Sequence, residues 1–391
     1  MNKKKVVLAY SGGLDTSIAI KWLMDRGYEV ICFMGDVGQG ADVKKAKARA
    51  LKIGAVKCEV ADLKEKFVTD YAFRALKAEA LYQGKYNLAT ALSRPIIAEA
   101  QANFAKKIGA DAVSHGCTGK GNDQVRFEVT YHIKAPKLEV IAPVREWELT
   151  TRESEIDYAK KHNIPIDQTK KKLYSIDLNL WGISVEGGKL EDPMFEPTKD
   201  TYISIARPEE APQKPEYVTI SFRKGIPYAI NGKKYNPVEL VQKLKKLGSI
   251  HGVGRVDMVE DRLIGIKSRE IYESPASAIL YAAHTSLEEL VLDREVRKYK
   301  KIVSERYAEL IYNGLWFTPL KEAIDGFVDK TQENVTGEVK LKLYKGNITI
   351  AGRKSPKSRY KEKLATYGEG DIFDQSLAKG FIDLWAMPYG K

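Results

Sequence analysis

The sequence predicts an α/β fold: a doubly wound domain built on a parallel sheet, followed by an α+β domain and a C-terminal helix. Three observations predict it. Apolar strand patterns alternate with helical patterns over the first 115 residues, two hairpin patterns lie in the second half, and an apolar helical stripe stands apart at the end. At 391 residues the chain exceeds what one hydrophobic core usually organises, so we expect two domains and a terminal appendage.

The first predicted unit is strand, helix and strand. Val6–Tyr10 and Glu29–Met34 are uninterrupted apolar runs, which are typical of parallel strands covered on both faces. Between them Ile18 and Trp22 recur at helical spacing, and Gly27 ends the pattern. These residues therefore predict one βαβ unit.

The same alternation continues with a helix at Asp42–Ile53, a strand at Ala55–Val60, two helical stretches that end at Gly109, and a strand at Asp111–His115. Ligands of doubly wound sheets bind beyond the carboxyl ends of the strands. We therefore expect the site in the loops "YSGGLDTS", after the first strand, and "HGCTGKGNDQVRFE", after the last one.

The organisation changes after about Asp167. A proline-rich stretch, "RPEEAPQKPEY", precedes a predicted antiparallel hairpin whose turn is the dipeptide Asn231-Gly232. A second hairpin is predicted at "EVKLKLYKGNITI". Antiparallel hairpins beside helices predict an α+β second domain.

Helices are predicted between and after these hairpins. Asn236 is a candidate N-cap and Gly248 a candidate end for one helix, and a long helical region spans Pro275–Tyr312. An apolar stripe ends the chain: Phe373, Leu377, Phe381, Leu384 and Trp385. We expect this stripe to pack on another subunit, because exposed apolar stripes mark interaction sites. The predicted domains are residues 1–167, 168–365 and 366–391.

The composition excludes several classes of protein. No apolar run approaches the roughly 20 residues that cross a bilayer, and the N-terminus lacks a signal-peptide pattern, so we expect a cytoplasmic protein without a membrane partner. The three cysteines Cys32, Cys58 and Cys117 are widely spaced, which argues against structural disulfides and zinc. The net charge of +12 comes from lysines dispersed among acids, so it does not by itself predict nucleic-acid binding.

The loop after the first strand is a predicted anion site. Gly12 and Gly13 allow a tight turn and close backbone approach, and the helix that follows presents free N–H groups in its first turn. Ser11, Thr16 and Ser17 add hydroxyl donors. Phosphate is the natural ligand, although neither the Walker pattern nor G-x-G-x-x-G is present.

"SGGLDTS" resembles the pyrophosphate loop of the N-type ATP pyrophosphatases. More narrowly, "AYSGGLDTS", "DVGQG", "HGCTGKGNDQVRFE", "SIDLNLWGIS" and "GIKSREIYESPA" resemble, in the same order, segments of the argininosuccinate synthase family. The resemblance covers nearly the whole chain. It implies that the first domain binds nucleotide, that the second is the synthetase domain, and that the C-terminal helix serves oligomerisation in a homotetramer.

The resemblance also implies a reaction. The ureido oxygen of citrulline attacks the α-phosphate of ATP, pyrophosphate leaves, and the aspartate amine displaces AMP to form argininosuccinate, with Mg²⁺ on the ATP phosphates. The protein's part is mainly positioning and charge neutralisation.

The same resemblance assigns residues to each substrate. The residues implied for ATP are Ala9, Tyr10, Ser11, Gly12, Gly13, Leu14, Asp15, Thr16, Ser17, Gly35 and Gly116. Those implied for citrulline are Tyr86, Asn122, Arg126, Ser175, Ser184, Glu260 and Tyr272, and those for aspartate are Thr118, Asn122 and Asp123. Asp15, Asp123 and Arg126 are the expected catalytic residues. No protein ligand for a metal is assigned.

One position departs from the family pattern. In "YNLATALSRP" the serine expected at citrulline is Ala91, and Thr90 is the candidate replacement for its hydroxyl. Each assigned residue also has a purely structural interpretation: Asp15 as a helix cap, for example, or Asp123 with Arg126 as an internal ion pair. We interpret His115 as a structural residue, and Cys117 has no activating partner in the pattern, so neither is assigned a catalytic role.

Two alternatives stay open at this point. One is a tRNA-modifying enzyme of the same superfamily, although a thiolase would need paired cysteines, which the sequence lacks. The other is a non-catalytic nucleotide-binding module whose C-terminal helix recruits partners. Neither accounts for the ordered citrulline and aspartate segments, so we expect small-molecule substrates and no nucleic acid.

Overall fold

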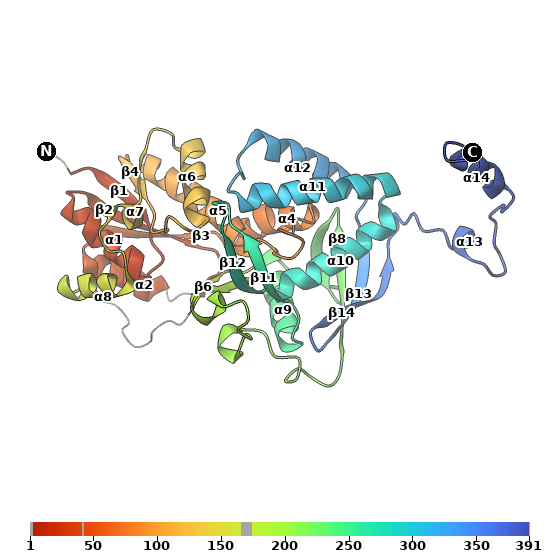
Figure 1. Ribbon diagram of the computed structural model, residues 1–391, viewed down its shortest axis with the longest axis horizontal. Helices are drawn as coiled ribbons and strands as arrows, with labels where there is room; N and C mark the ends of the chain where they lie inside the picture. Colours follow the sequence, from red (N-terminus) through yellow and green to blue (C-terminus); the bar gives the residue numbers. More distant parts are fainter. Residues whose placement is uncertain (1–2, 41–42, 166–173, 391) are drawn as a thin grey trace.

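The computed structural model describes residues 3–40, 43–165 and 174–390. It has two regions and a tail: a parallel-sheet region formed by the first part of the chain, a region with two antiparallel sheets, and a C-terminal extension (Figure 1). The predicted boundary between residues 167 and 168, and Asp42 at the predicted start of a helix, lie outside the described residues.

The parallel sheet has five strands in the order β3-β2-β1-β4-β5, and every neighbouring pair is parallel. Its strands are β1 (Lys5–Ala9), β2 (Glu29–Asp36), β3 (Lys57–Asp62), β4 (Ala112–Ser114) and β5 (Glu139–Ile141). The strand order reverses between β1 and β4. The loops that follow these two strands therefore leave the same edge side by side, where doubly wound sheets bind ligands.

Helices cover both faces of this sheet, as predicted. Alternate residues of β1 divide between the two faces: Val6 and Leu8 belong to one apolar cluster, and Val7 and Ala9 to the other. The first cluster includes residues of α1 (Leu14–Asp25), α2 (Val43–Ile53) and α8 (Arg152–Lys161), and the second includes residues of α5 (Ala89–Lys107) and α6 (Asp123–Lys134). The doubly wound architecture expected from the sequence is confirmed.

The second region contains two antiparallel sheets. One has the order β11-β12-β7-β6 and the other β10-β9-β8-β13-β14. The strands are β6 (Ser175–Leu178), β7 (Ile183–Glu186), β8 (Glu216–Arg223), β9 (Ile226–Ile230), β10 (Lys233–Lys234), β11 (Arg255–Asp261), β12 (Lys267–Glu273), β13 (Gly337–Tyr344) and β14 (Asn347–Lys354). Both predicted hairpins are present, with Asn231-Gly232 between β9 and β10.

Four helices pack with these sheets: α9 (Pro237–Ile250), α10 (Pro275–Val291), α11 (Arg294–Tyr312) and α12 (Pro319–Gln332). Part of the first 167 residues joins the same core. Residues 67–96, which include the π-helical segment Phe67–Ala72, α4 (Phe73–Lys77) and the start of α5, contribute side chains to the apolar cluster of the second region. Tyr71, for example, stacks on Trp316 with ring centroids 4.5 Å apart. This shared core connects the parallel sheet to the antiparallel sheets.

Two helix boundaries bear on the predictions. The Asn236 side chain accepts the Glu239 N–H at 2.9 Å, so this predicted N-cap is confirmed. The predicted end at Gly248 is wrong, because α9 continues to Ile250. Gly248 lies where α9 contacts α10: an added Cβ would lie 2.8 Å from the Cβ of Pro275, so the glycine allows close packing.

The long helical region predicted at Pro275–Tyr312 consists of two helices. α10 ends at Val291, and Asp293 begins α11 as an N-cap whose carboxylate accepts the N–H groups of Glu295 and Val296. An aspartate within a helical pattern can therefore end one helix and start the next.

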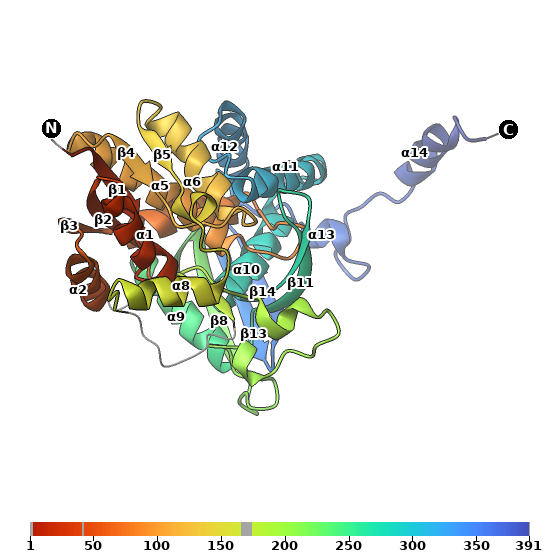
Figure 2. The same ribbon diagram turned by 60° about the vertical axis from the view of Figure 1, so that its left-hand side comes forward.

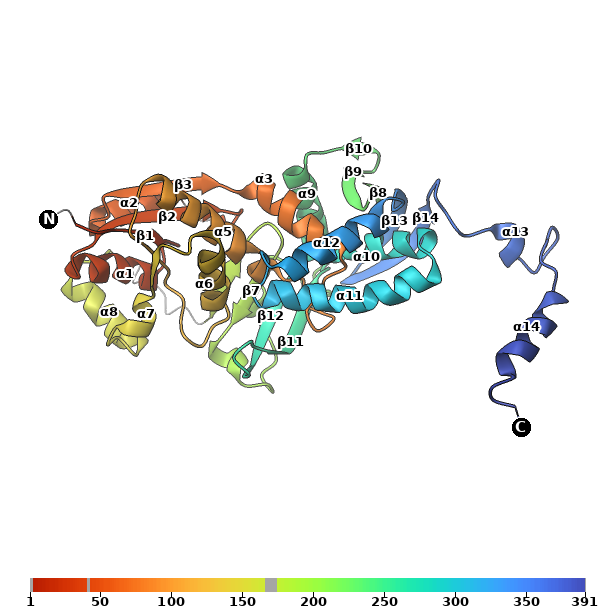
Figure 3. The same ribbon diagram turned by 90° about the horizontal axis from the view of Figure 1, so that it is seen from above.

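The C-terminal tail extends away from both regions, as Figure 2 and Figure 3 show for α13 (Glu362–Ala365) and α14 (Leu377–Ala386). Phe373 of the predicted stripe precedes α14. Leu377, Phe381, Leu384 and Trp385 are between 64% and 69% exposed, so the apolar face of α14 does not pack on its own chain. None of the helices in the described part of the chain is both long enough and apolar enough to span a membrane.

Candidate functional site

The loop after β1 has the geometry of an anion site. Gly12 adopts a φ of +80°, in the left-handed region that favours glycine, and an added Cβ would lie 3.0 Å from Ala46 Cβ. The Ser11 hydroxyl accepts the Gly13 N–H at 3.2 Å and lies 3.2 Å from the Thr16 hydroxyl. Within the described chain, no side chain caps the start of α1. The N–H groups of its first turn are therefore available for an anion.

The other residues expected at ATP lie around this loop in different environments. Ser17 is fully buried, and its hydroxyl lies 3.3 Å from the Tyr10 hydroxyl, whose pKa burial raises to about 12. Leu14 packs against the apolar cluster, and Asp15 forms an ion pair with Arg152 at 2.8 Å. Ala9 ends β1, and Gly35 lies near the end of β2. Ser17 and Leu14 thus contribute mainly to the scaffold of the loop.

The loop after β4 touches the first loop at Gly116. An added Cβ on Gly116 would lie 2.7 Å from Thr16 Cγ2, so only glycine allows this approach. Thr118, expected at aspartate, is exposed in the same loop. The structure therefore brings the two predicted loops together at the edge where the strand order reverses.

His115 and Cys117 follow β4 and are joined by a hydrogen bond. His115 is fully buried: Nε2 lies 2.9 Å from the Glu128 carboxylate, and Nδ1 accepts the Cys117 N–H at 3.2 Å. Burial raises the pKa of the Cys117 thiol, which makes it a poor nucleophile.

Asp123, at the start of α6, lies between two guanidinium groups. Its Oδ2 accepts a hydrogen bond from Arg94 Nε at 2.8 Å, and its Oδ1 accepts one from Arg126 Nη1 at 2.9 Å. Burial alone would raise the pKa of Asp123, but the two arginines outweigh it and hold the pKa below its usual value. Arg94 also pairs with Asp177 at 2.8 Å.

The start of α6 is held to the second region. Asn122 donates from Nδ2 to the Tyr312 hydroxyl at 2.8 Å and accepts the Leu263 N–H on Oδ1 at 2.9 Å. Arg126 donates from Nε to the Tyr312 carbonyl at 2.9 Å and is only 4% exposed. Both amide atoms of Asn122 are engaged, so its first role is to position this loop against the turn between β11 and β12 and against the end of α11.

One face of the β11-β12-β7-β6 sheet carries the remaining residues expected at citrulline. Tyr272 pairs with Ser184, Ser184 pairs with Asp177, and Glu260 pairs with Ser268, so these side chains share a face. Alternation along each strand then places the other polar residues there. The full set is Ser175, Asp177, Ser184, Glu186, Glu260, Ser268, Glu270 and Tyr272, of which Ser175 is exposed at the start of β6.

Tyr86 and Thr90 connect α5 to that face. Tyr86 stacks on Tyr272 with ring centroids 4.0 Å apart, and its hydroxyl accepts the Thr90 N–H at 3.0 Å. The Thr90 hydroxyl lies 3.1 Å from the Ser184 hydroxyl, whereas Ala91 is fully buried. Thr90 therefore presents a hydroxyl directly beside a residue expected at citrulline.

Several polar residues of this site were not identified from the sequence: Arg94, Asp177, Glu186, Arg262, Glu270 and Tyr312. Three of them could have been identified from the alternation of side chains along a strand, in which every second residue lies on the same face. Asp177, Glu186 and Glu270 each lie two positions from an assigned residue on the same strand. Burial raises the pKa of Glu186 even though Arg262 pairs with it.

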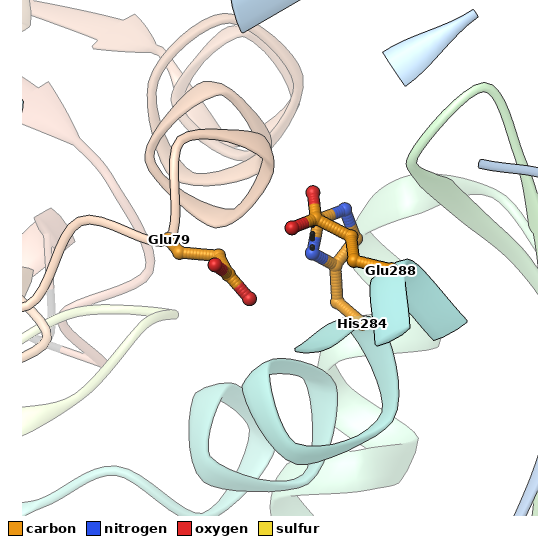
Figure 4. Close-up of side chains that lie close together, drawn as sticks. All are labelled: Glu79, His284 and Glu288. Carbon is orange, nitrogen blue, oxygen red and sulfur yellow. Dashed lines mark ion pairs between the residues drawn. The ribbon is translucent and has the colours of Figure 1, made fainter. Parts of the chain in front are cut away.

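A second buried polar cluster lies away from this site. Glu79, His284 and Glu288 bring ligand-type atoms within 4.8 Å of one another (Figure 4). The cation at this cluster is the ammonium of Lys300, 2.7 and 2.8 Å from the two Glu288 oxygens and 3.4 Å from Glu79 Oε2. Lys300 is 1% exposed, so we interpret the cluster as a buried ion pair rather than a metal site.

Known proteins resemble this chain over nearly its whole length. Residues 5–165 match the family model described as the arginosuccinate synthase N-terminal HUP domain, and residues 174–390 match the model of the C-terminal domain. The argininosuccinate synthase of Carboxydothermus hydrogenoformans is 55% identical over 98% of this chain and 96% of its own length. That of Aquifex aeolicus is 53% identical over 99% of this chain and 97% of its own length.

Among solved structures, a predicted subunit of a tRNA methyltransferase from Methanocaldococcus jannaschii aligns with a TM-score of 0.29 and 16% identity over 40% of this chain and 74% of its own, which is too low to support an argument. The two family models together span both sheet regions and the tail. The chain belongs to the argininosuccinate synthase family.

Proposed function

We propose that the protein ligates citrulline and aspartate to argininosuccinate, converting ATP to AMP and pyrophosphate through a citrullyl-adenylate. One observation carries the proposal. The glycine loop after β1 meets the loop after β4 at Gly116, and Arg94 joins Asp123, at the start of α6, to Asp177 on the polar sheet face that carries Ser184, Glu260 and Tyr272.

In this proposal the first loop holds the nucleotide. Gly12, Gly13 and the first turn of α1 offer N–H groups, and Ser11 and Thr16 offer hydroxyls, to the phosphates. Mg²⁺ takes one or two carboxylates together with phosphate oxygens, and Asp15 offers such a carboxylate at this loop. When bound, Mg²⁺ neutralises phosphate charge. The chain's own contribution is to orient the α-phosphate toward citrulline.

Citrulline and aspartate would lie between the loop after β4 and the sheet face. The urea of citrulline has a poor leaving group, so its oxygen must first be adenylated before the aspartate amine can displace AMP. Arg126 provides a guanidinium suited to a carboxylate. Glu260 offers a carboxylate suited to the α-ammonium of citrulline, and Tyr86, Ser184 and Tyr272 lie on the same side of the site. The residues proposed at aspartate are Thr118, Asn122 and Asp123.

The test is product analysis after incubation with Mg²⁺-ATP and citrulline, with and without aspartate. We expect argininosuccinate, AMP and pyrophosphate to appear together only when both amino acids are present. Formation of ADP, or AMP release that ignores both amino acids, would refute the ligase. The tRNA-modifying alternative predicts instead tRNA binding that weakens steeply with salt.

We also propose that the protein is a cytoplasmic homotetramer and that α14 packs on another subunit. The support is its exposed apolar face, with Phe381 and Trp385 stacked at 5.7 Å on a helix that projects from the rest of the chain (Figure 1). Sedimentation should show a tetramer for the full chain and a smaller species for a chain that ends at residue 370. Equal sizes for both would refute the role of α14.

A further inference from the structure

The Tyr272 hydroxyl lies between two carboxyl groups. It is 2.5 Å from Glu260 Oε2 and 2.9 Å from Glu270 Oε2, and Tyr272 itself is 2% exposed. A tyrosine hydroxyl carries a single proton, and an ionised carboxylate can only accept hydrogen bonds. One tyrosine proton therefore cannot satisfy both carboxyl groups.

The proton of Tyr272 belongs to the shorter contact, with Glu260. Glu260 accepts a second hydrogen bond on Oε1 from the Tyr312 hydroxyl at 2.5 Å, and Tyr312 in turn accepts one from Asn122 Nδ2 at 2.8 Å. The hydroxyl protons of Tyr272 and Tyr312 are therefore both donated to Glu260. The contact between Glu270 and Tyr272 then requires a second proton, located on Glu270 Oε2.

The groups that face Glu270 favour the same protonation. Glu260 faces it from β11 and Glu186 from β7, the strand paired with its own. The nearest cation among the described residues, Arg262, contacts Glu186 and lies 3.6 Å from Glu270 Oε1. Burial, followed by repulsion from Glu260 and Glu186, raises the pKa of Glu270 well above its usual value.

The other cations of the site are engaged elsewhere. Arg94 pairs with Asp123 and Asp177, and Arg126 pairs with Asp123. The wall formed by Glu186, Glu260 and Glu270 therefore contains more carboxyl groups than arginines, which suits a cationic ligand group such as an amino acid's α-ammonium. Glu270 lies on this wall two residues from Tyr272, on the same face of β12.

We propose that Glu270 is a further specificity residue of the citrulline site, a neutral acid in the free enzyme that gives up its proton when the citrulline ammonium binds between it and Glu260. This inference rests on the proposed function. The O–H bond of the Glu270 carboxyl breaks, its proton passes to solvent, and an N–H of the ammonium donates to the resulting carboxylate. The hydrogen bond that the protonated Glu270 donates to the Tyr272 oxygen is lost with this proton, and no other covalent bond changes.

Binding coupled to proton release has a measurable consequence. Citrulline should bind more tightly as the pH rises, by up to about tenfold per pH unit while Glu270 is protonated in the free enzyme. Glu270→Gln keeps a neutral side chain of the same shape, so it should release no proton and bind citrulline about tenfold more weakly, the loss of one hydrogen bond to a charged group.

The experiment is calorimetric titration of citrulline into the full chain at pH 7.5 in two buffers with different ionisation enthalpies. The difference in heat gives the number of protons released. We expect about one proton per site for the unaltered chain and for Glu270→Asp, and none for Glu270→Gln. Glu155→Gln is the matched control: burial raises the pKa of Glu155 to about 7, but Glu155 lies beside Asp15, and its variant should release the same proton as the unaltered chain.

The possible results distinguish a failure of the Glu270 proposal from a failure of the proposed function. Citrulline that binds without proton release, or a proton still released by Glu270→Gln, would overturn the role of Glu270 while leaving the proposed function standing. The role of Glu270 would also be overturned if Glu186→Gln released no proton on binding citrulline while Glu270→Gln still released one. No citrulline binding by the unaltered chain, together with no argininosuccinate formed, would refute the proposed function. If Glu270→Gln does not fold, the pH dependence of binding and Glu270→Asp still decide the question.

Discussion

Two carboxylate clusters in this molecule differ in what balances their charge. The interior cluster consists of Glu79, His284, Glu288 and Lys300. Its ammonium contacts both oxygens of Glu288 and one of Glu79, and Gln332 donates to Glu288 at 2.5 Å. The wall cluster consists of Glu186, Glu260 and Glu270, where tyrosine hydroxyls satisfy Glu260 and one arginine serves Glu186.

A raised carboxyl pKa does not distinguish these clusters. Burial raises the pKa of Glu288 to about 7 in the interior cluster, and it raises the pKa of Glu270 in the wall cluster. The clusters differ in whether they contain their own counter-ion. A cluster that contains its own ammonium needs no ligand, whereas the wall cluster has carboxyl groups in excess on a face that also carries Ser184 and Tyr272. Counting cations is therefore the more useful criterion for a binding site.

The largest expected effect is on the interior cluster. Lys300→Met leaves Glu288 and Glu79 buried without a cation and should lower the free energy of unfolding by about 3–5 kcal/mol. Denaturant unfolding measures this loss. Lys298→Met is the control: Lys298 is exposed and, among the described residues, pairs with exposed Glu295 alone, so its effect should stay within about 0.5 kcal/mol. Equal stability of the two variants would show that the buried pair contributes little.

The interior cluster should also respond to pH. His284 donates from Nε2 to Gln332, and burial, with the Lys300 ammonium, lowers the pKa of His284 to about 4. The unfolded chain binds this proton near pH 6.5 and the folded chain only near pH 4. Between these values the unfolded state holds more protons, so stability is lost as the pH falls.

His284→Gln should remove this dependence. The difference in unfolding free energy between the unaltered chain and the variant is expected to change by up to about 3 kcal/mol between pH 7 and pH 4, which unfolding curves at several pH values would measure. Glu288 titrates in both proteins, so the comparison isolates His284. A constant difference over this range would contradict the assignment of a neutral buried histidine.

On the wall cluster, a matching change should affect activity rather than stability. Glu260→Gln keeps an oxygen that accepts from Tyr272 or Tyr312, but it removes the charge offered to a substrate ammonium. We expect a loss of about 10- to 100-fold in kcat/KM for citrulline, as for a hydrogen bond to a charged group, with a small change in thermal stability. Glu288→Gln is the counterpart and should show a stability loss without a loss in kcat/KM. If Glu260→Gln mainly unfolds the protein, the distinction between the clusters is wrong.

The two parts of the site differ in how far the sequence predicts them. The loop after β1 is continuous in the chain, so "YSGGLDTS" after an apolar strand predicts both its turn and its place at the sheet edge. The polar face of the second sheet comes from four strands whose order is β11-β12-β7-β6, and no local pattern reveals that Tyr272 pairs with Ser184, 88 positions earlier in the chain by their numbers. Only the family resemblance brought these residues together.

Local rules also failed where tertiary packing overrides them. Gly248 matches a helix end in sequence, yet it lies inside α9 because α10 approaches there. The helical stretches of residues 67–96 follow the pattern of the first domain, but their apolar side chains complete the core of the second region. Arg94 escaped notice because its partners, Asp123 and Asp177, lie 29 and 83 positions away.

The smallest expected effect concerns Thr90, whose hydroxyl lies 3.1 Å from that of Ser184 beside the wall cluster. Thr90→Val keeps the shape but removes this hydrogen bond, so the KM for citrulline should rise about fivefold, equivalent to about 1 kcal/mol, while the KM for ATP is unchanged. Thr90→Ser retains the hydroxyl and should behave like the unaltered chain. Steady-state kinetics with each substrate varied in turn would measure both. If Thr90→Val leaves the KM for citrulline unchanged, the hydroxyl makes no contribution, and Thr90 does not compensate for the alanine at position 91.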